Sequence, residues 1–373
     1  MSFDVELARS ALPSTQQNAY FNAGTFGPLP RAAHEAMVAH SESSLLRGRI
    51  GHDALHAWLD EMDEVRAAFG ASLGVPSTEL ALNHCTTDGV NTVLWGLRWK
   101  AGDEVLTTTQ EHPGLTAPLE EVARVWGVTV RAVDPKSLAE SIRPETRLVA
   151  VSHVLWTNGD VLPLADIAAA ARKSGVPVLV DGAQSTGAIP VDLHATGVDF
   201  YTVSGQKWFC GPSGTGALWV HPRALASLGT PWPWYLSKDR FAQPMAEWTT
   251  TRRLDASTLS MTSLAGIRAA LLWHKTQVEA GALDAAMEKA ILLRANLAAL
   301  PNVRVVSVER ASTIVSFTLE GVAASIAATR LEDAGVLVRS IPGTEYVRAS
   351  VGFWNDEHDI ERLVQVVQAL STS

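Results

Sequence analysis

A lysine in a glycine-rich stretch has the clearest capacity for chemistry in this sequence. The stretch SGQKWFCGPSGTG covers residues 204–216 and contains Lys207. Two strand-like runs precede it, one ending at Asp181 and the next at Val203. In open α/β sheets, ligands bind outside the carboxyl ends of the strands. An amine and a carboxylate are therefore expected to meet at one edge of a sheet.

Each of these two residues also has an ordinary interpretation. Lys207 alone could be an exposed loop lysine, and Asp181 could cap a helix or a turn. Together they match what an enzyme needs to use pyridoxal 5'-phosphate (PLP): a lysine that carries the cofactor as a Schiff base, and an acid that faces the pyridine nitrogen. The acid keeps that nitrogen protonated, so that the ring accepts electrons from the substrate's Cα.

The elements that position this pair follow a regular alternation. From about residue 81, strand-like runs alternate with helical stretches. This alternation predicts an α/β fold with a mostly parallel sheet and helices on both faces. Before it, residues 31–48 and 53–72 have helical apolar spacing, and a further helix is expected from about Pro118 to Trp126.

After about residue 245 the pattern changes. A helical pair, roughly 260–279 and 282–299, precedes several strand candidates and a final helix after Asn355. We therefore expect three parts: an N-terminal segment at the substrate mouth (1–30), a large PLP-binding domain (31–245) and a small α+β C-terminal domain (246–373).

Composition narrows the class of protein. The 373 residues are 47% hydrophobic and 18% charged with a net charge of −9, which is typical of a globular chain and disfavours nucleic-acid binding. No apolar run is long enough to span a bilayer. The two cysteines, Cys85 and Cys210, make neither a disulfide framework nor a thiolate metal site, and no metal is expected. Without a secretory signal in MSFDVELARS, a cytoplasmic protein is expected.

Motifs along nearly the whole chain resemble one family. From about Tyr20 to the last helix, the sequence resembles the class V aminotransferase group of fold-type I PLP enzymes, which includes cysteine desulfurases, isopenicillin-N-epimerase-like proteins and cystine C–S lyases. The resemblance is carried, in order, by CTTDGVN, TQEHPGL, VDGAQ, SGQKWFC, RRLDASTLSM and YVRASVGFWN. It implies the fold-type I architecture, with a large domain and a smaller C-terminal one.

The resemblance also implies a role for each motif. Lys207 is similar to the Schiff-base lysine, Asp181 to the pyridine-nitrogen partner, and His112 to the histidine that stacks on the ring. The other implied cofactor contacts are Gln184 at the ring hydroxyl and, at the phosphate, Thr86, Thr87, Ser204, Gln206 and the neighbouring subunit's copy of Thr258. A phosphate contact from a neighbouring subunit implies a homodimer with shared active sites.

The implied substrate is a small amino acid. Arg348 aligns with the arginine that clamps the α-carboxylate, for which the guanidinium fork is suited. The implied lining of the substrate mouth is Asn22, Ala23, Gly24 and Trp156. Asn355 resembles a structural mark of the same motif as Arg348.

Three departures from the desulfurases narrow the reaction. No cysteine lies between Gly335 and Arg348, where they carry the nucleophile that takes sulfur. Gln206 stands where they commonly have histidine, and Trp156 where many relatives have asparagine. Cys210 falls within a motif shared with the lyase branch and is interpreted as packing.

The segments HVLWTNGDVLPL and KWFCGPSGTGAL are most similar to the cystine C–S lyase and epimerase branch. We therefore predict a PLP-dependent C–S lyase that performs β-elimination on a cysteine S-conjugate, giving thiol, pyruvate and ammonia, as in specialised metabolism. The alternatives are an amino acid epimerase, an aminotransferase or a decarboxylating deaminase. A catalytically silent PLP-fold partner protein is an alternative of another class. A nicotinamide enzyme is disfavoured, because GPSGTG precedes a strand instead of following the first one.

Overall fold

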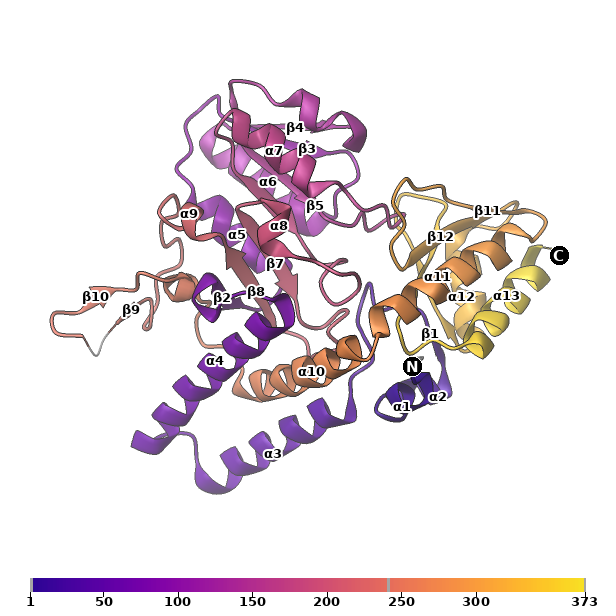
Figure 1. Ribbon diagram of the computed structural model, residues 1–373, viewed down its shortest axis with the longest axis horizontal. Coiled ribbons are helices and arrows are strands. Elements are labelled where there is room, and N and C mark those ends of the chain that lie inside the picture. Colours follow the sequence, from indigo (N-terminus) through magenta and orange to yellow (C-terminus); the bar gives the residue numbers. More distant parts are fainter. Residues whose placement is uncertain (1–2, 240–241, 372–373) are drawn as a thin grey trace.

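The computed structural model describes residues 3–239 and 242–371. A large and a small sheet lie in separate parts of the molecule, with helix α10 running below and between them (Figure 1). The large sheet has seven strands in the order β2-β8-β7-β6-β5-β3-β4. In that order they are β2 (Leu80–Asn83), β8 (Gly216–Val220), β7 (Phe200–Ser204), β6 (Val178–Asp181), β5 (Thr146–Ser152), β3 (Glu104–Thr108) and β4 (Thr129–Val133).

Strand direction in this sheet follows the prediction. Strands β4, β3, β5, β6 and β7 are parallel, and only β8 and β2 at one end run antiparallel to their neighbours. Strands of a parallel sheet are buried on both faces and consist of nearly continuous apolar residues. Strand β6 is an example, since all four of its residues are buried.

Successive residues of the strands supply two different cores. Val178 and Val180 pack on one face with α4 (His52–Leu73), α7 (Leu164–Lys173) and α10 (Met261–Glu279). Leu179 points to the other face, where α5 (Thr86–Gly96) and α6 (Pro113–Trp126) cover the sheet. The period-2 alternation of a strand and helices on both faces give the α/β architecture that the sequence predicts.

The small part is an antiparallel sheet with helices on one face. Its strands, in sheet order, are β11 (Val303–Val305), β12 (Ile314–Leu319), β15 (Val347–Ser350) and β14 (Arg339–Ser340). The covering helices are α11 (Ala282–Ala298), α12 (Ala324–Asp333) and α13 (Glu357–Ser371). On β15, Val347 and Ala349 pack into this helical core. Arg348 therefore points to the opposite face of the sheet.

The N-terminal segment is attached to the small part before it crosses to the large one. It contains α1 (Val5–Ser10), α2 (Ser14–Gln17) and β1 (Ala19–Tyr20), and β1 pairs in parallel with β13 (Val336–Leu337). The chain then enters α3 (Arg31–Arg47), which packs against α10, as does α4. Helices α3, α4, α10, α11 and α13 lie where the apolar spacing predicts. The exact domain boundaries stay a prediction.

One helix begins earlier than expected. Helix α6 starts at Pro113, not near Pro118, because His112 caps it and Pro113 occupies its first turn, where proline has no hydrogen bond to lose. The remaining short elements are η1 (Ser77–Glu79), η2 (Pro135–Ser137), η3 (Ala139–Ser141), α8 (Leu193–Thr196), α9 (Pro222–Leu225), β9 (Lys238–Asp239), β10 (Ala246–Glu247) and η4 (Thr251–Leu254).

The described residues contain neither a membrane-spanning helix nor a cluster of metal ligands. No helix there has the length and apolar character needed to cross a membrane. No group of three or more His, Cys, Asp or Glu side chains among them is arranged to hold a metal ion.

Candidate active site

Lys207 lies in a tight loop directly after β7. Gly205 N–H donates to Thr215 O (2.8 Å) and Gly211 N–H donates to Gly205 O (2.8 Å). The end of the loop therefore contacts its beginning. The side chain is largely enclosed, and burial lowers the pKa of Lys207 to about 8, against the opposing effect of the Asp181 charge. Burial disfavours the ammonium form, so the amine is available as a base or nucleophile near neutral pH.

Asp181 ends β6, the strand next to β7, and is paired in register with Thr202 of β7. Only 5% of Asp181 is exposed, and its Oδ1 accepts a hydrogen bond from Ala183 N–H (2.9 Å). Burial raises the pKa of Asp181, and the Lys207 charge lowers it. The amine and the acid thus come from neighbouring strands and interact electrostatically.

His112 lies at the start of α6 with its imidazole partly enclosed. Its Nδ1 accepts a hydrogen bond from Gly114 N–H (2.9 Å), and the ring makes an edge contact with Trp156 at 4.8 Å between centroids. Burial first, and the charges of Lys207 and Arg348 next, lower the pKa of His112 to about 4. The imidazole is therefore neutral at physiological pH and presents an uncharged flat surface.

The first turn of α5 supplies donors for an anion. Thr86 and Thr87 begin this helix, and free N–H groups at a helix N-terminus attract negative charge. Gly114 of α6 lies against this turn: a Cβ there would be 2.6 Å from Thr87 Oγ1 and 3.0 Å from His112 Nδ1. A glycine is thus required where the two helix starts meet.

Ser204 and Gln206 flank the lysine loop and contact each other, since Ser204 Oγ donates to Gln206 Oε1 (2.9 Å). Thr258 lies apart from them, exposed, with a left-handed φ of 45°. A β-branched residue rarely adopts this conformation, so the position is strained.

Arg348 is the most enclosed cation of the site, with 1% of its surface exposed. Its Nη1 donates to Trp156 O (3.0 Å), its Nη2 lies 3.4 Å from Thr25 Oγ1, and its Nε has no hydrogen-bond partner. Burial lowers the pKa of Arg348 to about 9, which leaves the guanidinium charged at neutral pH. A buried charge needs a counter-charge, so this position suits a substrate carboxylate.

Arg339 is a second cation next to Arg348 that the sequence analysis does not single out. It is paired in register with Arg348 across β14 and β15, and its Nη1 also lies 3.4 Å from Thr25 Oγ1. Thr25 Oγ1 in turn donates to Asn22 Oδ1 (2.8 Å). The signal that could have found it is the single arginine in LVRSIP, since this strand candidate directly precedes the one that carries Arg348.

Residues 22–27 form the wall between the two parts. Gln184 Nε2 donates to Gly24 O (2.9 Å), and Gln184 Oε1 accepts from Trp208 Nε1 (3.1 Å). A Cβ at Gly24 would lie 2.8 Å from Arg348 Nη2, so only glycine fits beside the guanidinium. Ala23 is fully buried just before it. Asn22, Ala23, Gly24 and Trp156 therefore all come close to Arg348 or to the residues around it.

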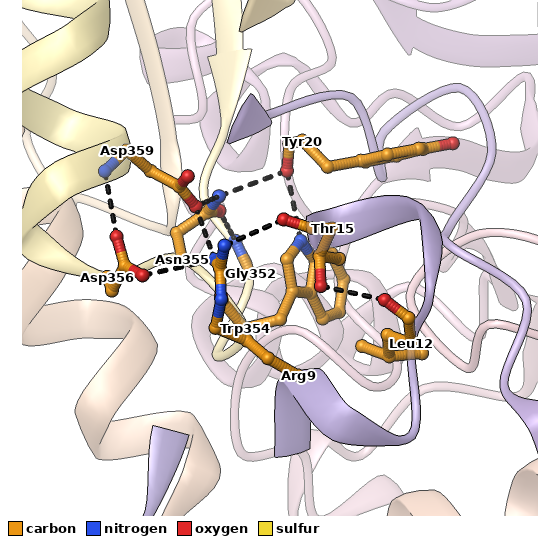
Figure 2. Close-up of polar contacts among 9 residues, drawn as sticks. All are labelled: Arg9, Leu12, Thr15, Tyr20, Gly352, Trp354, Asn355, Asp356 and Asp359. Atoms are coloured by element: carbon orange, nitrogen blue, oxygen red, sulfur yellow. Dashed lines mark hydrogen bonds and ion pairs between the residues drawn. The ribbon is translucent and has the colours of Figure 1, made fainter. Parts of the chain in front are cut away.

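A polar cluster anchors this wall to the small part (Figure 2). Arg9 donates to Asp359 Oδ2 (2.8 Å), Trp354 O (2.8 Å) and Thr15 O (2.7 Å). Tyr20 O accepts from Asn355 Nδ2 (3.2 Å) and from Trp354 Nε1 (2.9 Å). The same Asn355 amide donates to Asp359 Oδ2 (3.0 Å). The chain is thus fixed just before it reaches the site.

The chemical groups of these side chains are the ones that PLP requires. The site offers an amine, a buried carboxyl on the adjacent strand, a neutral imidazole and a helix N-terminus with two hydroxyls. Because Gly114 has no side chain, the N-terminus of α5 can lie close to the imidazole of His112.

Known proteins are similar to this chain over most of its length. The family model for aminotransferase class-V matches residues 19–363. A probable cysteine desulfurase of Xylella fastidiosa is 27% identical over 404 residues, covering 97% of this chain and 94% of that protein. The isopenicillin N epimerase of Streptomyces clavuligerus is 31% identical over 240 residues, covering 60% of this chain and 59% of that protein.

Among solved structures, the cystine C–S lyase C-DES in complex with its reaction product cysteine persulfide has a TM-score of 0.89 and 31% identity, covering 96% of this chain and 99% of that chain. A C-DES mutant with glycine covalently linked to its PLP cofactor has a TM-score of 0.90 and 31% identity, covering 96% of this chain and 98% of that one. Together with the family match, these likenesses confirm the predicted fold-type I architecture.

Proposed function

The chain belongs to the class V aminotransferase family, and from that premise we propose that it is a C–S lyase that performs β-elimination on a cysteine S-conjugate, releasing thiol, pyruvate and ammonia. PLP is the cofactor, as in this family. The observation that carries the proposal is the buried Arg348 with the half-buried Arg339 next to it, both near Lys207. The two guanidinium groups share a threonine hydroxyl and have no acidic partner among the described residues, so they suit the carboxylate of an amino acid.

In this proposal four side chains hold the cofactor ring. Lys207 binds PLP covalently, Asp181 stabilises a proton at the pyridine nitrogen, Gln184 donates to the ring hydroxyl and His112 stacks on the ring. The Gln184 amide has two N–H donors and Gly24 uses one of them, so a second remains. Because His112 is neutral, its imidazole can stack on the cofactor ring without adding a charge near Asp181 and Lys207.

The phosphate would be held at the N-terminus of α5. Thr86 and Thr87 supply hydroxyl and N–H donors there, with Ser204 and Gln206 from the lysine loop. Thr258 completes the set from the neighbouring subunit, which makes the protein a homodimer with shared active sites. The exposed, strained conformation of Thr258 supports this role.

Lys207 is also the proposed base. When bound, PLP withdraws electron density from the substrate's Cα and so makes the proton there removable. The amine of Lys207, with its pKa lowered to about 8 by burial, takes that proton. Arg348 holds the α-carboxylate, and with it the Cα, within reach of the amine. Asn22, Ala23, Gly24 and Trp156 enclose the substrate mouth.

Two features favour elimination with release of a thiol over sulfur transfer to the protein. The hairpin between β14 and β15 contains no cysteine and is closed by the Ile341 N–H to Tyr346 O hydrogen bond (2.9 Å). Cys210 near the lysine is fully buried, and burial raises its pKa, so its thiol is inert.

The main alternative is an amino acid epimerase, favoured by the likeness to isopenicillin N epimerase. An aminotransferase or a decarboxylating deaminase would use the same residues to bind the amino acid, until the first bond at Cα is broken. A silent partner protein is disfavoured, because Lys207, Asp181 and His112 are all kept. Product analysis separates these reactions, since only β-elimination gives thiol and pyruvate in equal amounts.

The test is incubation of the PLP-loaded protein with cystine and a panel of S-substituted cysteines, measuring thiol, pyruvate and ammonia. We expect all three products with at least one substrate, and none with the Lys207→Ala variant, which also loses the visible absorbance of bound PLP. Arg348→Ala should keep that absorbance and lower kcat/KM about a hundredfold, because a buried charge pair is lost.

Two results would contradict the proposal. One is thiol without pyruvate, or an aldehyde together with carbon dioxide. The other is an unchanged kcat/KM in Arg348→Ala. The exposed Arg304, replaced by Ala, is the matched control and should leave both measurements unchanged.

A further inference from the structure

A second buried carboxyl lies beside the site and has no part in the proposed function. Glu111 directly precedes His112 in the loop between β3 and α6, and only 8% of it is exposed. An acidic side chain is seldom buried so far unless it is paired or hydrogen-bonded. Its contacts therefore require an explanation.

Three hydrogen bonds fix the Glu111 carboxyl. Its Oε1 accepts from Thr108 Oγ1 (2.7 Å), and its Oε2 accepts from Ser152 N–H (2.9 Å) and Ser152 Oγ (2.5 Å). Thr108 is the last residue of β3, and Ser152 is the last residue of β5. The carboxyl thus joins the carboxyl ends of two adjacent strands to the loop that leads into α6.

The residues on either side of this joint are the proposed cofactor contacts. His112 follows Glu111 in the chain and caps α6. Ser152 is paired in register with Asp181 on β6. Burial raises the pKa of Glu111 to about 7, and the charge of Asp181 acts in the same direction. Glu111 is therefore close enough to Asp181 to interact with it electrostatically.

We propose that Glu111 is a positioning residue for the cofactor: by joining β3 and β5 to the His112 loop, it sets the imidazole and the Asp181 carboxyl at the separation that the ring requires. The inference rests on the proposed roles of His112 and Asp181. It assigns to Glu111 no contact with PLP and no proton transfer.

The physical reason is the cost of removing this acceptor. Without it, the Ser152 N–H and two hydroxyls in a buried place lose their partner, which costs more than the hydrogen bonds themselves contribute. The loop would relax toward other partners, and His112 would move with it. Glutamine is a conservative replacement, because its carbonyl oxygen can accept from Ser152 and its amide can donate to Thr108 Oγ1.

The experiment measures PLP binding to purified apo-protein by visible absorbance, together with the induced circular dichroism of the bound cofactor, which reports how the ring is held. We expect Glu111→Ala to weaken PLP binding about tenfold, the effect of roughly one unsatisfied buried group, and to reduce the dichroism per bound cofactor. Glu111→Gln should bind within about threefold of the parent and keep its dichroism. Glu120→Ala, an exposed acid on α6, is the matched control and should equal the parent.

The outcomes separate this inference from the proposed function. A parent protein that binds no PLP overturns the proposed function. If the parent protein binds PLP and Glu111→Ala has the same PLP affinity and dichroism as the parent, only the inference is overturned. The same holds if Glu111→Gln is as impaired in PLP binding as Glu111→Ala. If Glu111→Ala does not fold, Ser152→Ala takes its place. We expect this variant to bind PLP about threefold more weakly, because it loses one hydrogen bond to Glu111. Unchanged PLP binding in Ser152→Ala would overturn the inference.

Discussion

At the scale of single residues, burial sets the protonation of the groups around Lys207. The pKa values of Lys207, His112 and Arg348 are all lowered, to about 8, 4 and 9, because enclosure disfavours their charged forms. Neighbouring positive charges lower these pKa values further: Lys207 and Arg348 act on His112, Arg348 acts on Lys207, and Arg339 acts on Arg348. The site is consequently poised to accept anions, the phosphate of a cofactor and the carboxylate of a substrate.

The lowered pKa of Lys207 predicts how cofactor uptake depends on pH. Only the neutral amine attacks the aldehyde of PLP, and the ammonium form that predominates below the pKa does not. The rate at which apo-protein takes up PLP should therefore rise with pH to a midpoint near 8 and then level off. Stopped-flow absorbance at a series of pH values measures this. A midpoint near the ordinary lysine value of 10.5 would contradict the predicted burial effect. The exposed Lys100, replaced by Ala, should leave the profile unchanged.

At the scale of elements, the N-terminal segment connects a distant ion pair to the surroundings of Arg348. Arg9 in α1 binds Asp359 in α13. From there β1 runs along β13, and the chain reaches Gly24 and Thr25 beside Arg348. The helices before β1 therefore anchor residues 22–27, which are proposed to enclose the substrate mouth.

Removing this anchor should affect the substrate more than the cofactor. Arg9 and Asp359 are 12% and 4% exposed, so Arg9→Gln leaves a buried carboxylate without its cation and should lower the free energy of unfolding by about 3 kcal/mol. We expect KM for the amino acid to rise severalfold at unchanged PLP affinity. Chemical denaturation and steady-state kinetics measure the two effects. Equal losses in PLP affinity and KM would argue against a local role, and Arg31→Gln, at an exposed position, is the control.

At the scale of the whole molecule, one corner of the surface exposes apolar side chains. Leu45, Leu46 and Ile50, at the corner between α3 and α4, are 82%, 82% and 94% exposed. This corner extends away from both sheets (Figure 1). Adjacent exposed apolar side chains often mark a contact with another protein. The strained Thr258 is the residue proposed to act in the neighbouring site.

A dimer with shared sites predicts complementation between two defective subunits. Lys207→Ala and Thr258→Val should each have low activity at limiting PLP. A mixed dimer, however, has one site with an intact Lys207 from one subunit and an intact Thr258 from the other, so co-expression should restore activity. The mass in solution should be twice 39.9 kDa. A monomer, or the absence of any restored activity, would contradict the shared site, and Ser257→Ala is the matched control.

The sequence by itself determined the local structure and the central pair. The apolar spacing located α3, α4, α10, α11 and α13, and the ends of two strand runs brought Asp181 and Lys207 to one sheet edge. These features follow from periodicity and from the direction of parallel strands, both of which can be read along the chain.

Only the tertiary structure decided how distant segments meet around that pair. Arg339 faces Arg348 through a strand register, Thr25 connects them from the other end of the chain, and the burial of Glu111 depends on the ends of β3 and β5. Strand neighbours, registers and enclosure are set by packing across the whole core, and no spacing within one segment encodes them.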